Sequence, residues 1–506
     1  MAIYGKSFSG TPEDAALFHP WIASKLPCPR GMPIGLCMRT GRVVYFDPWL
    51  LKDMGLITGL IFLMLGVRGS GKTSLLIELI TELIARQAGI DKKTGYPNEM
   101  NVRITTRKAN MGNEDDEELD EDDENSEAEF KATNDFLYGN FVDINQQGFI
   151  NIFDPKMGMS EWDLLETGVN VCELANNEVP LINFQPLALQ VGVHKMLTQF
   201  SAIASPEVLE VATRTLTMYD LENYFFRSNS EVLGTFDKVL AQQPELKAQL
   251  GVTMNKPHNV PKQEFLHDAG FVSAQMGRVL RGDFGQVFGG TNSLHDILSD
   301  TVTTLNMTGL NSKARTLVES MLWKWNTIAM TRKDYGLIPG INIGDEEHEG
   351  AESLMYMRYW AQNVAKARAY RTADFRATQY RKQLTEAGSE GSEIRAKANQ
   401  INTGIGAHFI GRMADIDSAV EDLSGFGVAE HDIMNTVDYG PGQFGFLIPG
   451  QPIFPFQALL TPTQFELARS DQATESMMEF MPVMSFEHIQ ERERQVGFVQ
   501  LGVDSE

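Results

Sequence analysis

The sequence predicts an α/β fold in which a mostly parallel sheet is flanked by helices and carries an inserted helical subdomain. Three observations lead to this prediction. Short apolar runs alternate with segments of helical periodicity, a glycine-rich loop joins one such run to an amphipathic helix, and the middle of the chain has few strand signals. The 506 residues, 42% of them hydrophobic, suffice for one large core with insertions or for two domains.

The first strong elements lie on either side of this loop. Residues 60–65 predict a central parallel strand because the run is short, continuously apolar and stopped by glycine. A helix is predicted over 72–87, where the apolar residues fall on one face and Gly89 follows as a stop. Further strand candidates are 42–46, 149–153, 169–174, 181–184, 302–307 and 341–344, and a late hairpin pairs 444–448 with 457–460.

These elements divide the chain into a core with insertions. The predicted parts are an N-terminal lead segment 1–50, a first core part 51–204, an inserted helical subdomain 205–300, a second core part 301–469 and a polar tail 470–506.

The net charge is acidic and unevenly distributed. Of the formal charge of −24, half comes from residues 114–129, which hold twelve acidic residues and no basic one. Because like charges repel and this tract cannot build a core, we predict a disordered insertion over 109–130. The acidic remainder argues against nonspecific duplex DNA binding by the whole surface, although it leaves a basic pore or patch open.

Cysteine spacing and hydropathy indicate a cytoplasmic protein. Cys28, Cys37 and Cys172 show no CxxC spacing and are expected to be reduced structural thiols. The N-terminus lacks the apolar region of a signal peptide, and the most apolar run, 56–65, is about half the ~20 residues that a membrane helix needs. We therefore expect no membrane span, and any association with the inner face of the cell membrane to come through partners.

The glycine-rich loop fits the phosphate-binding pattern G-x-x-x-x-G-K-[ST] without deviation. Its glycines let the backbone bend closely around phosphates, and its N–H groups and the following helix N-terminus point at anionic oxygens. Lys72 would reach the β and γ phosphates, and the Thr73 hydroxyl would bind Mg²⁺. The predicted residues for nucleotide, with ATP expected, are Gly66, Val67, Arg68, Gly69, Ser70, Gly71, Lys72, Thr73 and Ser74.

Hydrolysis requires further groups at the ends of neighbouring strands. After the strand 341–344, Asp345 is the predicted Mg²⁺ partner and Glu346 the carboxylate that activates water, with an exposed acidic turn as the alternative. Asp154, which also follows a predicted strand, is the alternative carboxylate for Mg²⁺. Gln379 is the predicted sensor of the γ phosphate, with a surface amide as the alternative.

The densest basic stretch, 366–382, surrounds this glutamine and is predicted to be helical. It is either a solvated face or a functional surface, and it contains Lys366, Arg368, Arg371, Arg376, Arg381 and Lys382.

Taken in order, the motifs resemble one family of motors. The series is GVRGSGKT, DPK at 154–156, PLINFQPL at 180–187, LRGDFGQVFGG at 280–290, NMTGL at 306–310, GDEEH at 344–348 and TQ at 378–379. It resembles the C-terminal motor domain of conjugative type IV secretion ATPases, the VirB/TraC-like class, which is related to the HerA/FtsK motors. The resemblance covers residues 30–465 approximately and implies a RecA-like P-loop NTPase fold.

The resemblance also implies roles and partners. Lys72 and Thr73 would serve the nucleotide, Asp345 and Glu346 the second acidic motif, and Gln379 the sensor. In a hexameric ring, Arg371 would act on the neighbouring subunit's nucleotide, with Arg368, Arg376 and Arg412 as alternatives.

The function expected from this resemblance is that of an ATP- and Mg²⁺-dependent motor that transfers DNA or protein, with secretion-channel components at the membrane as partners. Two alternatives stay open. One is a HerA/FtsK-type DNA translocase or packaging ATPase with the basic helix 366–382 lining a pore. The other is a nonhydrolysing, nucleotide-dependent scaffold that binds partners through its acidic tract.

Overall fold

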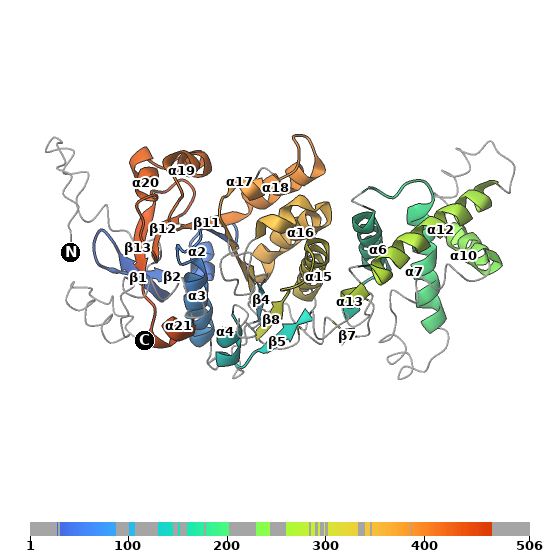
Figure 1. Cartoon of the computed structure of the whole chain (residues 1–506), viewed down its shortest axis with the longest axis horizontal. Helices are drawn as coiled ribbons and strands as arrows, with labels where there is room; N and C mark the ends of the chain where they lie inside the picture. The colour runs from blue at the N-terminus through green and yellow to red at the C-terminus, as the bar shows by residue number, and fades with distance from the viewer. Residues whose placement is uncertain are drawn as a thin grey trace, which may run out of the picture. The chain divides into compact units, whose positions relative to one another are not determined.

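The computed structural model shows the predicted α/β fold, a mixed and largely parallel sheet flanked by helices (Figure 1). Asp154, Asp345, Glu346 and the acidic tract 114–129 lie outside the described residues. Described are residues 28, 31–87, 101–106, 130–144, 150–151, 159–176, 179–201, 229–242, 260–282, 285–288, 292–293, 298, 302–331, 340–344, 347–385 and 387–467. In these ranges, no helix combines the length and the apolar character that crossing a membrane requires.

The chain divides into two compact units. The first comprises residues 1–58, 64–86 and 406–506, and the second comprises 59–63 and 87–405. Strand β3 (Ile61–Leu65) contributes residues to both.

The first unit contains antiparallel strands in the order β2-β1-β13-β12-β11. The predicted strand at 42–46 is confirmed as β2, and β1, from the same lead segment, pairs with it. The predicted hairpin is confirmed as β12 and β13, with Phe444 opposite Phe456, but its second strand begins three residues before the predicted 457–460. The strands are β1 (Met32–Cys37), β2 (Val43–Phe46), β11 (Ile405–Ile410), β12 (Gln443–Leu447) and β13 (Phe454–Ala458).

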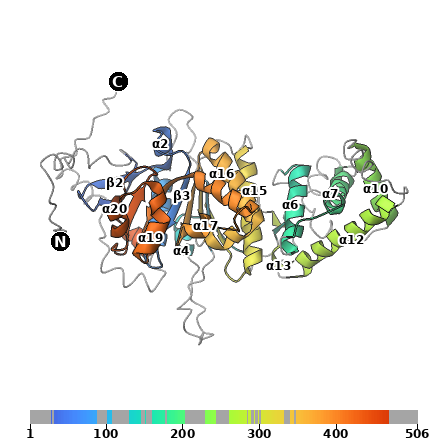
Figure 2. The ribbon, with the colours of Figure 1, turned by 90° about the horizontal axis from the view of Figure 1, so that it is seen from above.

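Helices of the first unit include the predicted helix at 72–87, confirmed with those bounds as α3 (Lys72–Gln87). Between β11 and β12 the chain forms α19 and α20, which lie together in Figure 2. The remaining helices are α2 (Pro48–Asp53), α19 (Ile416–Leu423), the 3-10 turn η3 (Ser424–Phe426), α20 (Glu430–Asn435) and α21 (Pro462–Leu467).

The second unit contains parallel strands in the order β10-β9-β4-β8-β5. The predicted strands at 302–307 and 341–344 are confirmed as β8 and β9. The strands are β4 (Asn101–Thr106), β5 (Asn140–Asp143), β8 (Val302–Asn306), β9 (Gly340–Gly344) and β10 (Thr372–Thr378).

Helices α15 and α16 pack against each other beside this sheet, with the rings of Trp323 and Trp360 stacked at 6.0 Å between centroids. Both tryptophans are buried. The helices here are α4 (Lys131–Phe136), α15 (Ser312–Thr331), η2 (Glu347–Glu352), α16 (Leu354–Tyr370), α17 (Lys382–Thr385) and α18 (Glu393–Thr403).

A cluster of helices extends the predicted helical subdomain 205–300 back to Glu161 (Figure 1). The strand predicted at 169–174 is wrong, because this apolar run lies within α6, which a capping box between Ser160 and Asp163 begins. The strand predicted at 181–184 is wrong as well, because these residues form a turn before α7. The cluster comprises α6 (Glu161–Ala175), α7 (Gln185–Ser201), α10 (Asn229–Gln242), α12 (Val260–Arg281) and α13 (Gly285–Phe288), next to a strand pair, β6 (Ile150–Asn151) and β7 (Asn292–Ser293).

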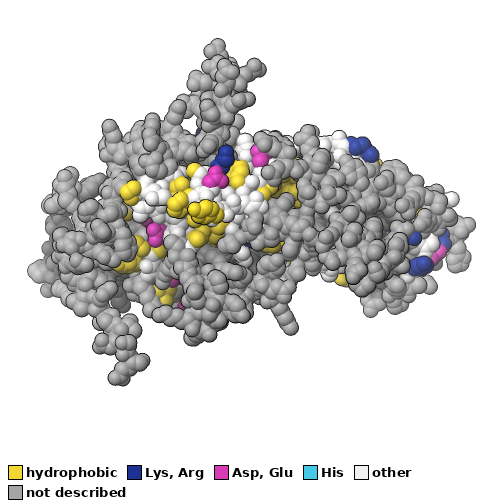
Figure 3. All heavy atoms as spheres, turned by 90° about the horizontal axis from the view of Figure 1, so that it is seen from below, with side chains coloured by type: hydrophobic (Ala, Val, Ile, Leu, Met, Phe, Trp, Pro, Cys, Tyr) yellow, Lys and Arg dark blue, Asp and Glu magenta, His cyan; other side chains and the backbone are white. Residues whose placement is uncertain are grey.

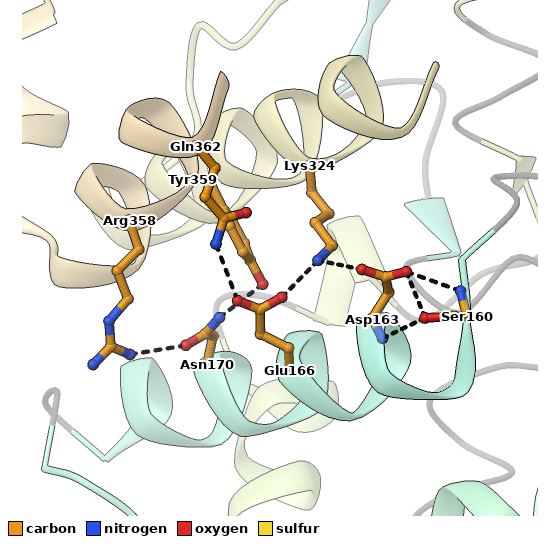
Figure 4. A network of polar contacts seen from close by, with 8 residues as sticks. All are labelled: Ser160, Asp163, Glu166, Asn170, Lys324, Arg358, Tyr359 and Gln362. Atoms are coloured by element: carbon orange, nitrogen blue, oxygen red, sulfur yellow. Dashed lines mark hydrogen bonds and ion pairs between the residues drawn. The ribbon is translucent and has the colours of Figure 1, made fainter. Parts of the chain in front are cut away.

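Charged contacts tie α6 to α15 and α16 (Figure 4). The buried Lys324 ammonium lies 2.6 Å from one carboxylate oxygen each of Asp163 and Glu166. Burial raises the pKa of Asp163, but the hydrogen bonds from Lys324 and Ser160, together with the Lys324 charge, outweigh burial, so this pKa lies below its usual range. Arg358 donates to Asn170 on the same face of α6. The helical cluster is thus attached through charge pairs rather than apolar contacts alone.

The predicted basic helix at 366–382 is wrong. Helix α16 ends at Tyr370, Arg371 turns the chain with a left-handed φ of 57°, and β10 begins at once. All seven residues of β10 are buried, among them Arg376, whose Nε lies 2.6 Å from a carboxylate oxygen of Asp374. A buried ion pair therefore makes a core strand look polar in the sequence.

Candidate nucleotide-binding site

The loop between β3 and α3 has the backbone of a phosphate cradle. Gly66, Gly69 and Gly71 have φ values of 144°, 74° and 93°, which side-chain-bearing residues rarely adopt. A Cβ at Gly66 would lie 2.9 Å from Ser70 Oγ, and one at Gly71 would lie 3.2 Å from the backbone nitrogen of Gly442. Both the conformation and the available space therefore require glycine at these two positions.

Lys72 lies over the loop that precedes it. Its Nζ donates to the carbonyl oxygens of Gly66, at 2.7 Å, and Val67, at 3.2 Å, and the residue is 8% exposed. Thr73 and Ser74 follow in the first turn of α3, where backbone N–H groups have no partner within the helix. A cation and a helix N-terminus thus meet at one loop, a combination suited to binding anionic phosphate.

Helix α3 is held by α21, a helix that the sequence patterns did not predict. The Nε2 of Gln464, on α21, donates to Thr81 Oγ1 at 2.9 Å and to Glu82 Oε1 at 3.2 Å. Glu78, one turn earlier, is 1% exposed, and burial followed by the nearby charge of Glu82 raises its pKa well above the usual range. Burial therefore favours the protonated form of this carboxyl group on the helix behind the loop.

Three residues with predicted roles in hydrolysis follow two parallel strands in the sequence. In the register of β9 and β10, Gly344 lies opposite Arg376, so both strands leave the sheet at the same edge. Asp345 and Glu346 come directly after Gly344 but lie outside the described residues. Gln379, half-buried, comes directly after Thr378 at the end of β10. The described carboxyl ends of these two strands thus lie at one edge of the sheet, where Gln379 follows β10.

Arg371, the predicted trans-acting arginine, does not lie beside Gln379. Arg371 precedes β10, so the length of this strand, about 20 Å at ~3.3 Å per residue, separates the two. Arg371 is exposed at the opposite edge of the sheet. Among the alternatives, Arg376 is buried in its ion pair, Arg412 is exposed after β11, and the side chain of Arg368 is outside the described set.

The three cysteines are buried and free of disulfides. Within the part of the chain that the structure describes, no group of three or more His, Cys, Asp or Glu side chains is arranged to hold a metal ion.

The fold of this chain is similar to solved structures of other proteins. No protein family and no curated protein matches the sequence. VirB4 of Thermoanaerobacter pseudethanolicus is similar in structure, with 12% identity, a TM-score of 0.58, and coverage of 87% of this chain and 99% of that chain.

Structures of the bacterial conjugative coupling protein TrwB also match. The unbound form has 11% identity, covers 86% of this chain and 91% of that chain, and has a TM-score of 0.49. The complex of TrwB with ADP and Mg²⁺ has 13% identity, the same coverage values of 86% and 91%, and a TM-score of 0.48. The VirB4 match confirms, at the level of the fold, the resemblance that the sequence motifs indicate.

Proposed function

We propose that this chain binds ATP with Mg²⁺ and hydrolyses it as a motor of a conjugation or type IV secretion system, driving the transfer of DNA or protein. The observation that carries the proposal is the loop from Gly66 to Thr73. It has three glycines in the conformations a phosphate cradle needs and the Lys72 ammonium held at its carbonyls. The fold shared with VirB4 supports placing this loop in a secretion motor.

The proposed chemistry divides between binding and hydrolysis. The N–H groups of the loop and of the first turn of α3 bind the phosphates, and Lys72 balances their charge. Thr73 and Asp345 would hold Mg²⁺, which neutralises phosphate charge when bound. Glu346 orients and deprotonates the attacking water, and Gln379 hydrogen-bonds the γ phosphate. In the proposed assembly, a hexameric ring meets channel components at the membrane.

The decisive experiment is ATP turnover by the purified protein with and without single- and double-stranded DNA. Turnover is expected. Stimulation by DNA that weakens with salt would favour a translocase, and tight ATP binding without turnover would favour the scaffold and overturn the motor. On the face shown in Figure 3, the described Lys and Arg side chains lie in small groups rather than in a continuous stripe.

Glu346→Gln is expected to keep ATP affinity and to lower turnover by about a hundredfold or more, because the amide cannot accept the proton of the attacking water. Binding of a fluorescent ATP analogue and steady-state ATPase rates measure the two effects. Glu352→Gln, after the same strand, is the matched control. Turnover at the wild-type rate in Glu346→Gln would show that another residue activates the water.

Arg371→Ala is expected to lower turnover about tenfold or more with little change in ATP affinity, since an arginine acting in trans stabilises mainly transition-state charge. Mixing two variant subunits tests whether Arg371 acts on the nucleotide of a neighbouring subunit. Lys72→Ala subunits supply an intact Arg371, and Arg371→Ala subunits supply an intact loop. Mixed assemblies are expected to recover part of the ATPase activity. Assemblies shown to contain both subunits and yet to remain inactive would exclude Arg371 from this role.

A further inference from the structure

The phosphate-binding loop is hydrogen-bonded to two other segments of the first unit. The backbone N–H of Val67 donates to the carbonyl of Arg412 at 2.9 Å, directly after β11. The backbone N–H of Gly442 donates to the carbonyl of Ser70 at 3.1 Å, directly before β12. These two bonds hold the span from Val67 to Ser70 at both ends.

The phosphate-binding loop also packs closely against these two segments. A Cβ at Gly411 would lie 3.0 Å from the Cβ and Oγ of Ser70, and a Cβ at Gly71 would lie 3.4 Å from the Cα of Gly442. Ser70 is 1% exposed. The loop therefore has little room to shift while these segments stay in place.

Gly442 is in turn fixed by strand β13. Its carbonyl accepts hydrogen bonds from the backbone N–H of Ala458, at 2.8 Å, and from the side-chain Nε2 of Gln457, at 3.1 Å. The Oε1 of Gln443 accepts from the N–H of Gly440 at 2.8 Å and braces the same turn. Of these contacts to the Gly442 carbonyl, the one from Gln457 comes from a side chain, so a substitution can remove it and leave the strand pairing intact.

We infer that Gln457 is a positioning residue for the nucleotide, which through Gly442 holds the phosphate-binding loop in its binding conformation before ATP arrives. The inference rests on the proposed function. A loop ordered in advance loses less conformational entropy on binding, so the hydrogen bond contributes to affinity without touching the ligand. Because the contact does not involve the reacting atoms, it affects binding rather than the chemical step.

The test compares Gln457→Ala, the isosteric Gln457→Glu, and Gln451→Ala, an exposed glutamine of the β12–β13 connection, as the control. Gln457→Ala is expected to weaken ATP binding and raise KM about tenfold, the effect of about one hydrogen bond, with kcat unchanged. Gln457→Glu should be at least as weak, because a carboxylate cannot donate to the Gly442 carbonyl. Wild-type affinity in either variant would overturn the inference.

Hydrogen exchange of the peptide containing residues 66–72, measured without nucleotide, gives a second and independent readout. Faster exchange is expected in both Gln457 variants and not in Gln451→Ala. Unchanged exchange would overturn the inference even if wild-type protein bound no ATP, whereas absence of ATP binding by the wild type would overturn the proposed function alone.

Discussion

Lys72→Ala is expected to weaken ATP binding by about a hundredfold or more and to abolish turnover. The Lys72 ammonium donates to two carbonyls of the loop from Gly66 to Thr73, at 2.7 and 3.2 Å. Its removal takes a cationic partner from the phosphates and leaves the carbonyls of Gly66 and Val67 without these hydrogen bonds. Equilibrium binding of a fluorescent ATP analogue and the steady-state ATPase rate measure the effect.

The matched control is Lys382→Ala, at an exposed lysine of the second unit. It is expected to bind and hydrolyse ATP like the wild type. Thermal unfolding of both variants separates loss of the site from loss of the fold. If folded Lys72→Ala protein bound ATP with wild-type affinity, the loop would not be the nucleotide site.

The parts of the fold that local sequence determines were predictable. Strand β3, the glycine-rich loop and α3 follow from a continuous apolar run, required glycines and a one-sided apolar stripe. The hairpin of β12 and β13 was marked by its turn residues. The loop itself was therefore predictable to the residue.

The parts that tertiary contacts determine were not predictable. The run 169–174 is too short to show whether it is a strand or a helix, although the Ser160 capping box was a signal that could have decided it. The hydrogen bond between Gly442 and Ser70 joins residues 372 positions apart, and no local sequence pattern predicts it.

Strand β10 shows the same limit most clearly, because its polar residues are satisfied by partners from elsewhere. Arg376 and Asp374 have side chains only 5% and 1% exposed, with Nε and a carboxylate oxygen 2.6 Å apart. The indole N–H of Trp360 donates to the other oxygen of Asp374 at 3.1 Å, and the Arg376 guanidinium lies 4.2 Å from the ring centroid of Trp323. In sequence these charges resemble a solvated helix face.

Arg376→Leu is therefore expected to destabilise the second unit by about 3–5 kcal/mol, because Asp374 would keep a buried charge without this partner. That loss is a large share of the about 5–15 kcal/mol that stabilises a typical domain. Urea unfolding followed by tryptophan fluorescence measures it, with Trp323 and Trp360 reporting on the contact itself. Arg412→Leu, at an exposed arginine, is the control and should unfold like the wild type.

The double variant Asp374→Asn with Arg376→Leu distinguishes an uncompensated charge from a loss of packing. Asparagine keeps an oxygen to accept from Trp360 but carries no charge, so the double variant is expected to be more stable than Arg376→Leu alone. If the double variant were no more stable than the single one, the cavity left by the arginine side chain would account for the loss. If Arg376→Leu unfolded at the wild-type urea concentration, the ion pair would contribute nothing to the stability of this unit, and the burial of its two charges would need another explanation.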